Sequence, residues 1–295
     1  MSKKQKSHWL NPLAILTLTT VAWSNSTLAN EANPTTIASF SPATESIEIY
    51  VPPPEKGNTG VCAALIEPAI KSIIGIQSNS WGILVETLNE RTTIYSHNAD
   101  KYFIPASNIK IFTTAAALQK LNPQTAIRSK SLKDWITVTN QRSVNSYADM
   151  LMNYIGGTQA AKAALTQLGV DPNSYRLADG SGLSRHNVAT PRAIVATLRA
   201  IHFASGSEVF HASLPVAGIS GTLRNRLRWT PAQGIVYAKT GTLTGVRALS
   251  GYINHPSYGM LVFSILVNQS NQSGDALVRS IDNIVLQLSQ LAPCE

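Results

Sequence analysis

Residues 107–110 are Ser107-Asn108-Ile109-Lys110, and they open an apolar run that extends to Leu121 and stops at Asn122-Pro123. The run contains three consecutive alanines and ends on a strong helix-stop signal, so it predicts a buried helix that begins near Ser107. On such a helix Lys110 lies one turn after Ser107, on the same face. A lysine in that position can take the serine proton only if burial or a second cation lowers its pKa.

Two further short motifs follow along the chain. Ser143-Val144-Asn145 stands at the predicted start of another helix, and Lys239-Thr240-Gly241-Thr242 lies on a predicted strand. Each motif alone has an ordinary structural explanation: the two serine motifs are typical of helix caps, and the third is typical of a strand end followed by a glycine turn. Their joint occurrence in this order, on two helix starts and then a strand, is characteristic of serine β-lactamases and penicillin-binding proteins.

The rest of the chain predicts an α+β fold. Apolar residues at helical spacing indicate helices at 61–74, 143–155, 159–168, 190–203 and 274–291. Alternating or apolar segments bounded by turns indicate strands at 81–88, 92–95, 235–239, 247–253 and 260–267. A helix and a hairpin, then a helical block, then three strands and a helix form a mostly antiparallel α+β pattern.

The N-terminal segment has the features of an export signal. Lys3, Lys4 and Lys6 precede a short apolar run, and Ala29 ends a small-residue stretch suited to signal peptidase. We therefore predict a signal peptide at 1–29 and an exported, periplasmic or cell-envelope protein, with no stable membrane span after cleavage; a retained anchor is the alternative. Residues 30–60, rich in Pro, Thr, Ser and Ala, predict a flexible linker. Residues 61–295 remain as the folded domain.

Charge and composition exclude several other classes. Removing the three N-terminal lysines lowers the net charge from +8 to +5, and no zinc-finger or RNA-binding motif is present, so nucleic acid is not an expected partner. The scattered histidines and the two cysteines form no metal-binding spacing, so neither a metal nor a cofactor is expected. Cys62 and Cys294 lie near the two ends of the domain, and we predict that they form a disulfide. The sequence leaves the oligomeric state open.

Longer stretches carry a more specific resemblance. The chain resembles the D-alanyl-D-alanine carboxypeptidase/endopeptidases among the class C low-molecular-mass penicillin-binding proteins, from about Val61 to Leu291. The stretches that carry it are residues 95–99, 105–110, 179–185, 214–218 and 238–243.

This resemblance implies a β-lactamase/transpeptidase-like fold, a five-stranded sheet with helices on both faces. It implies a serine D,D-carboxypeptidase/endopeptidase that binds peptidoglycan peptides and β-lactams. The implied roles are nucleophile for Ser107, base for Lys110 and proton relay for Ser143. Backbone N–H groups of Ser107 and Thr242 would form the oxyanion hole. Substrate binding is implied for Asn145, Lys239, Thr240, Gly241 and Thr242.

The chain departs from the family pattern in one large respect. The family carries inserted domains between its first two motifs, but here Ser143 follows Ser107 by only 36 residues. We predict that a polar loop at 122–141 replaces them. Val144 also stands where an acidic residue is common. A β-lactamase is one alternative. Such an enzyme often uses a glutamate base for deacylation, and Glu208 is the only glutamate between Asn145 and Lys239. A non-catalytic peptidoglycan-binding member is the other.

Overall fold

The computed structural model describes residues 61–293. The predicted signal peptide (1–29) and linker (30–60) lie outside these residues, as does Cys294. Within residues 61–293, no helix is long and apolar enough to cross a bilayer. Nor does this part of the chain contain a group of three or more His, Cys, Asp or Glu side chains that could hold a metal ion.

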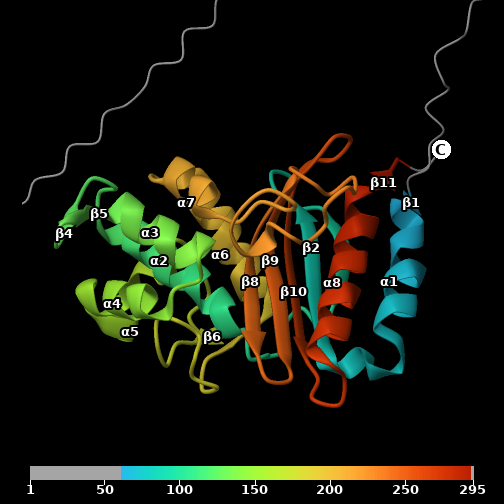
Figure 1. Ribbon diagram of the computed structural model, residues 1–295, viewed down its shortest axis with the longest axis horizontal. Helices are drawn as coiled ribbons and strands as arrows, with labels where there is room; N and C mark the ends of the chain where they lie inside the picture. The colour runs from blue at the N-terminus through green and yellow to red at the C-terminus, as the bar shows by residue number, and fades with distance from the viewer. Residues whose placement is uncertain (1–60, 294–295) are drawn as a thin grey trace, which may run out of the picture. The chain divides into compact units, whose positions relative to one another are not determined.

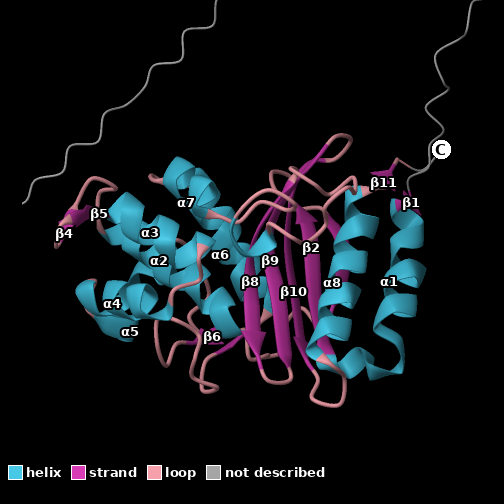
Figure 2. Ribbon diagram, in the orientation of Figure 1, coloured by secondary structure: helices cyan, strands magenta, loops and turns pink. Residues whose placement is uncertain are grey.

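A five-stranded antiparallel sheet forms the centre of the fold, in the order β3-β2-β10-β9-β8 (Figure 2). An N-terminal hairpin supplies two strands and a C-terminal meander supplies three, so pairing of β10 with β2 joins the two ends of the domain. The strands are β2 (Trp81–Thr87), β3 (Thr93–His97), β8 (Val236–Leu243), β9 (Val246–His255) and β10 (Gly259–Asn268). The predicted sheet is confirmed.

Helices cover both faces of this sheet (Figure 1). One face packs against α1 (Ile66–Ile74) and α8 (Gly274–Ser289). Because both faces are covered, alternate residues of β10 enter different cores: Phe263 lies in this core, whereas Val262 lies in the other. The second core contains α2 (Ile109–Lys120), α3 (Leu132–Gln141), α4 (Asn145–Tyr154), α5 (Gly157–Gln167), α6 (Pro191–Phe203) and α7 (Ser207–Ser213).

Short elements complete the domain. Strand β1 (Val61–Cys62) pairs in parallel with β11 (Leu291–Ala292), which brings the two ends of the described chain together. Two small hairpins are β4 (Ala126–Ile127) with β5 (Lys130–Ser131), and β6 (Tyr175–Arg176) with β7 (Val188–Ala189). Single 3-10 turns are η1 (Ala63–Leu65), η3 (Ala106–Asn108) and η4 (Gly221–Leu223), and a longer, kinked 3-10 segment is η2 (Gly75–Ser80).

The segment that replaces the family's inserted domains is not the predicted loop. It forms the β4–β5 hairpin and the ten-residue helix α3. Ser131 and Asp134 make a reciprocal capping box at the start of α3, which satisfies its first free N–H groups. Trp135 and Ile136 are buried on its inner face. The prediction was wrong because polar residues on the outer face interrupt a short apolar stripe. Helix α7 was also not predicted.

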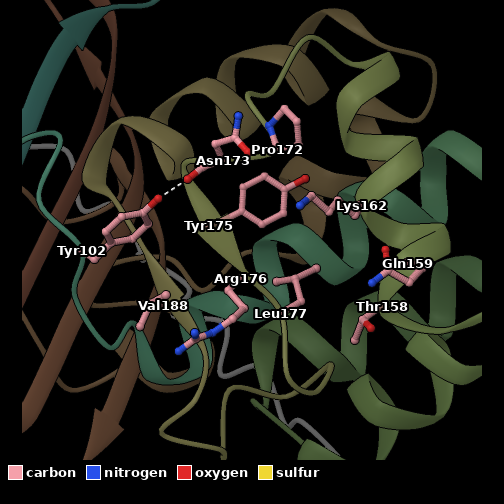
Figure 3. A pocket seen from close by; sticks show the side chains of 10 residues that line it. All are labelled: Tyr102, Thr158, Gln159, Lys162, Pro172, Asn173, Tyr175, Arg176, Leu177 and Val188. Carbon is pink, nitrogen blue, oxygen red and sulfur yellow. Dashed lines mark hydrogen bonds between the residues drawn. The ribbon is translucent and has the colours of Figure 1, made fainter.

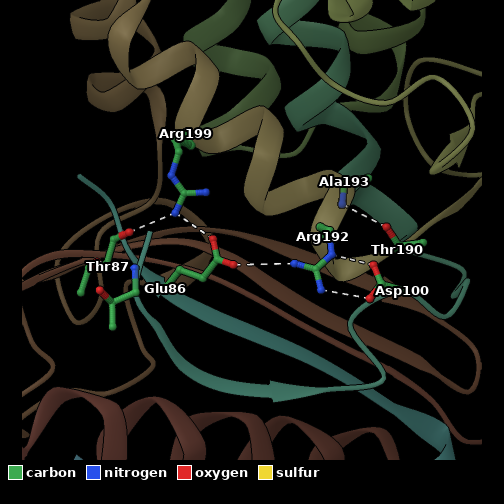
Figure 4. Close-up of polar contacts among 8 residues, drawn as sticks. Glu86, Thr87, Asp100, Thr190, Arg192, Ala193 and Arg199 are labelled. Carbon is green, nitrogen blue, oxygen red and sulfur yellow. Dashed lines mark hydrogen bonds and ion pairs between the residues drawn. The ribbon is translucent and has the colours of Figure 1, made fainter. Parts of the chain in front are cut away.

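An ion-pair network fastens α6 to the hairpin β2–β3 (Figure 4). Arg199 and Glu86 are both buried, and Arg199 Nη2 lies 2.9 Å from Glu86 Oε2. Arg199 also donates to the carbonyls of Thr87 and Leu88, at 3.0 Å each. These backbone contacts satisfy the guanidinium and fix the helix against the end of β2.

Candidate active site

Ser107 lies in η3, which leads directly into α2. The preceding residue, Ala106, has φ +48°, a left-handed conformation that costs a residue with a Cβ about 1–3 kcal/mol. Gly182 packs against this turn so closely that a Cβ at 182 would stand 1.8 Å from the Ala106 carbonyl oxygen. The loop that contains Gly182 therefore supports the turn that presents Ser107.

Lys110 is fully buried beside the serine. Its Nζ lies 2.9 Å from Ser107 Oγ, 2.8 Å from Asn145 Oδ1 and 2.6 Å from the Ser181 carbonyl oxygen. The amine is thus held by an amide and a backbone carbonyl, and it faces the hydroxyl at proton-transfer distance.

Two carboxylates influence Lys110, although neither lies at ion-pair distance from it. Burial lowers the pKa of Lys110 to about 8, while the carboxylates of Asp149 and Asp179 act in the opposite direction. Asp149 Oδ1 accepts from the Gly180 N–H at 3.0 Å, so the loop that contains Gly182 also holds the Asp149 carboxylate in place. The lowered pKa leaves part of the population with a neutral amine at neutral pH, as a general base requires.

The Asp179 carboxylate organises the loop that carries Ser181. It accepts from the backbone N–H groups of Ser181, Gly182 and Ser184, at 3.0, 2.6 and 2.7 Å. The Asn187 side-chain amide adds a fourth donor to this carboxylate, at 3.0 Å, so the loop is restrained at several points. The Ser181 carbonyl is thereby aimed at Lys110.

A second serine–lysine pair lies next to the first. Lys239 is fully buried, and its Nζ lies 2.8 Å from Ser143 Oγ and 3.0 Å from the Thr240 carbonyl oxygen. Ser143 has φ +56° in the turn before α4. Burial and then the charge of Lys110 hold the pKa of Lys239 well below its usual range. Among residues 61–293, neither lysine has a carboxylate at ion-pair distance.

Strand β8 forms the edge of the sheet beside these pairs. The Asn108 side chain donates to the Lys239 carbonyl at 2.9 Å, which ties the serine turn to this strand. A Cβ on Gly241 would stand 2.7 Å from the Pro105 carbonyl oxygen, so only glycine allows this approach. The Thr240 hydroxyl lies 2.8 Å from the Thr222 hydroxyl in η4.

The structure therefore brings the three predicted motifs together. Ser107, Lys110 and Asn145 form one chain of contacts, and Ser143 and Lys239 form the neighbouring one. Thr242 is exposed at the end of β8 and makes no side-chain hydrogen bond within the described part of the chain. Sequence reasoning missed several supporting groups: Ala106, Asn108, Asp149, Asp179, the Ser181 carbonyl and Thr222.

One family matches most of the folded domain. It is described as the D-Ala-D-Ala carboxypeptidase 3 (S13) family, and it matches residues 64–128 and 125–290, which include all three motifs. The chain belongs to this S13 family. The two matched parts meet at residues 125–128, in the β4–β5 hairpin. This position lies between the first two motifs, where the family insertion is absent.

Individual relatives agree with the S13 assignment. The chain is 42% identical over 166 residues to the D-alanyl-D-alanine carboxypeptidase of Actinomadura sp. (strain R39), covering 51% of this chain. It is 32% identical over 181 residues to the penicillin-sensitive carboxypeptidase A of Dictyostelium discoideum, and this match covers 55% of this chain. The matched regions cover only 30% and 35% of these relatives, so the chain spans about a third of their length.

Solved structures show the same fold. Penicillin binding protein 4 from Haemophilus influenzae superposes with a TM-score of 0.63 at 16% identity, over 75% of this chain and 99% of that chain. A class A β-lactamase from Clostridium kluyveri DSM 555 superposes with a TM-score of 0.61 at 17% identity, over 75% and 97% of the chains. The predicted β-lactamase/transpeptidase-like fold is confirmed. Identities this low concern the fold alone.

Proposed function

We propose that this S13-family chain is a serine D,D-carboxypeptidase/endopeptidase of the cell envelope that acts on D-alanine-containing peptidoglycan peptides and is acylated by β-lactams. The observation that carries the proposal is the 2.9 Å contact between Ser107 Oγ and a buried Lys110 whose pKa is lowered to about 8. The family assignment supports the same reaction.

In the proposed reaction, Ser107 Oγ attacks the carbonyl carbon between the last two D-alanines. Its proton passes to Lys110 Nζ, and backbone N–H groups of Ser107 and Thr242 stabilise the oxyanion. The C–N bond then breaks, and the departing amine takes a proton delivered through Ser143. Water hydrolyses the acyl-enzyme and restores Ser107.

Lys239 would recognise the terminal carboxylate of the substrate. Without substrate, burial and Lys110 disfavour its ammonium form. A carboxylate that arrives beside Thr240 and Thr242 would raise the pKa of Lys239 and so favour the charged form. Asn145 would hydrogen-bond the peptide through its amide nitrogen, since its Oδ1 already accepts from Lys110. The edge of β8 at Gly241 would pair with the peptide backbone.

Acylation by benzylpenicillin tests the nucleophile. Intact-mass measurement and peptide mapping should place one penicilloyl group on Ser107 in the wild type. Ser107→Ala should carry none and keep its melting temperature. Ser143→Ala should still be labelled at Ser107, though more slowly. An adduct mapped to Ser143, or none on the wild type, would contradict the proposal.

Digestion of purified muropeptides then tests the substrate. Release of D-alanine indicates carboxypeptidase action, and loss of crosslinked dimers indicates endopeptidase action. We expect slow turnover of short D-Ala-D-Ala peptides, because contacts remote from the scissile bond accelerate the chemical step and the inserted domains that would make them are absent. A kcat/KM near ~10⁵ M⁻¹s⁻¹ on a diacetyl-tripeptide would show that these contacts are not needed.

A β-lactamase is the second candidate, because a solved β-lactamase shares the fold. Class A β-lactamases use a glutamate and a water for deacylation. Here Glu208, the only glutamate between Asn145 and Lys239, is exposed on α7. We therefore expect a long-lived penicilloyl-enzyme. Hydrolysis of many equivalents of a chromogenic cephalosporin per protein molecule would favour the β-lactamase instead.

A further inference from the structure

A hollow of about 620 Å³ lies outside the proposed catalytic cleft (Figure 3). It is formed by the first turns of α5, the β6–β7 hairpin and Tyr102, and none of the proposed catalytic or substrate-binding residues lines it. Its volume falls within the range of about 300–1,000 Å³ that is typical of small-ligand sites. The Tyr102 hydroxyl donates to the Asn173 carbonyl at one side of the hollow.

The residues that line the hollow include two cations and no carboxylate, although the Asp171 carboxylate beside the lining residue Pro172 acts on Tyr175. Lys162 and Arg176 are the two cations, and Arg176 is held by a 3.0 Å bond from Nε to the His186 carbonyl. The first turn of α5 contributes Thr158 and Gln159, and no side chain caps this helix terminus. Uncapped N–H groups and the positive end of the helix dipole favour an anion there.

A buried hydroxyl in the wall lacks a partner. Tyr175 is 3% exposed, and its hydroxyl makes no hydrogen bond within the described part of the chain. In Figure 3 the Tyr175 hydroxyl is directed toward the Lys162 side chain. The nearby Thr166 hydroxyl donates to the Lys162 carbonyl, at 2.9 Å, and it opposes the rise in the pKa of Tyr175 that burial and the Asp171 carboxylate cause. Leaving a buried hydroxyl unpaired is unfavourable, so an incoming acceptor would gain affinity from pairing with it.

We propose that this hollow is a second ligand site, which binds the carboxylate of a peptide. Lys162, Arg176 and the N-terminus of α5 would hold the carboxylate, and the Tyr175 hydroxyl would donate to it once the Lys162 side chain turns toward the ligand. Apolar walls at Leu177 and Val188 would cover the peptide's methyl groups. Choosing a D-alanine-terminated peptide as the occupant rests on the proposed function; the anion site itself does not.

The site lies on the same hairpin as part of the cleft. Strands β6 and β7 form one wall of the hollow, and the loop between them contains Asp179 and Ser181, which face Lys110. A peptide product leaving the cleft would thus meet a second carboxylate site on the opposite end of one short hairpin.

Calorimetric titration tests the proposal. The probe is diacetyl-L-Lys-D-Ala, which lacks the scissile D-Ala-D-Ala bond, and it is titrated into wild-type protein before and after treatment with benzylpenicillin. Lys162→Gln with Arg176→Gln should weaken binding at least about tenfold, and Tyr175→Phe about threefold. Lys133→Gln, a matched change of an exposed lysine on α3, should leave it unchanged. The affinity should survive benzylpenicillin treatment.

Two ligand controls define the chemistry. The carboxamide of the same dipeptide should bind at least about tenfold more weakly, because it lacks the charge that the two cations recognise. Equal binding by the double variant, equal binding of the carboxamide, or no saturable binding would overturn the proposal. Tighter binding of inorganic phosphate than of the dipeptide would overturn the assignment to a peptide carboxylate. Failure of Ser107 to be acylated would instead count against the proposed function alone.

Discussion

The pH dependence of acylation should report the protonation of Lys110. Lowering its pKa from 10.5 to about 8 raises the fraction of neutral amine at pH 7 from roughly one molecule in 3,000 to roughly one in ten. The neutral amine is the form that can accept the Ser107 proton. The acylation rate should therefore rise about tenfold per pH unit below 8 and level off above it.

Removing the Asp149 charge distinguishes titration of Lys110 from titration of the neighbouring Lys239. The Asp149 carboxylate raises the pKa of Lys110, whereas the charge that acts on Lys239 is that of Lys110. In Asp149→Asn the amide oxygen can still accept from the Gly180 N–H, so the loop is retained. Loss of the charge should move the midpoint down by about 0.5–1 unit and speed acylation at pH 7 about three- to fivefold.

The assay is the second-order rate constant of labelling by a fluorescent penicillin, followed from about pH 6 to 9. Glu208→Gln, which removes an exposed carboxylate on α7, is the control and should leave the profile unchanged. A flat profile, or a midpoint that moves upward in Asp149→Asn, would refute the assignment of Lys110 as the base.

Three other predictions concern stability. Arg199→Ala should lower the free energy of unfolding in denaturant melts by about 3–5 kcal/mol, because the buried Glu86 loses its 2.9 Å partner and keeps only a 3.8 Å contact with Arg192. Arg192→Ala, which loses that longer contact and an exposed pair with Asp100, should cost less than about 1 kcal/mol, and equal losses would contradict this. Burial and the neighbouring His202 imidazole lower the pKa of His211 to about 4. Between pH 6.5 and 4 the unfolded chain therefore binds a proton that folded His211 does not, so the free energy of unfolding should be at its full value above pH 6.5 and fall by about 1–2 kcal/mol as the pH drops toward 4. The same pH dependence in melts of His211→Gln would show that His211 is not its cause. Cys62 pairs through its backbone with Ala292, two residues before Cys294, and a disulfide closing so long a loop should add about 4–5 kcal/mol; two free thiols titrated in denatured, unreduced protein would rule it out.

The central sheet and its covering helices could be predicted from the sequence because their apolar periods are long and uninterrupted. On α8, for example, Leu277, Ile281, Ile284 and Leu288 recur at helical spacing, and all four are buried. Thr190 followed by Pro191 is a typical helix start, and in the structure the Thr190 hydroxyl accepts from the Ala193 N–H at the start of α6. Helix α3 was missed because its stripe is short and its start depends on a reciprocal cap rather than on hydrophobicity.

The supporting groups of the site had no comparable signal. The Ser181 carbonyl is a backbone atom, so its contact with Lys110 leaves no mark on residue type. The left-handed conformations of Ala106 and Ser143 are equally invisible, since alanine and serine carry no preference for them. Asn108 looks like a helix-start residue, but its amide bonds to the carbonyl of Lys239, 131 residues away. Only the assembled fold reveals such contacts.

The position of the absent insertion explains why the constellation is intact. The two parts of the family match meet in the β4–β5 hairpin, after α2 has ended and before α3 begins. Every group that positions Lys110 lies elsewhere: on η3, on α4 and in the 179–185 loop. The capping box restarts the chain as a helix directly after the hairpin, and α3 then leads into the turn that carries Ser143. The serine–lysine geometry thus forms without any inserted domain between the first two motifs.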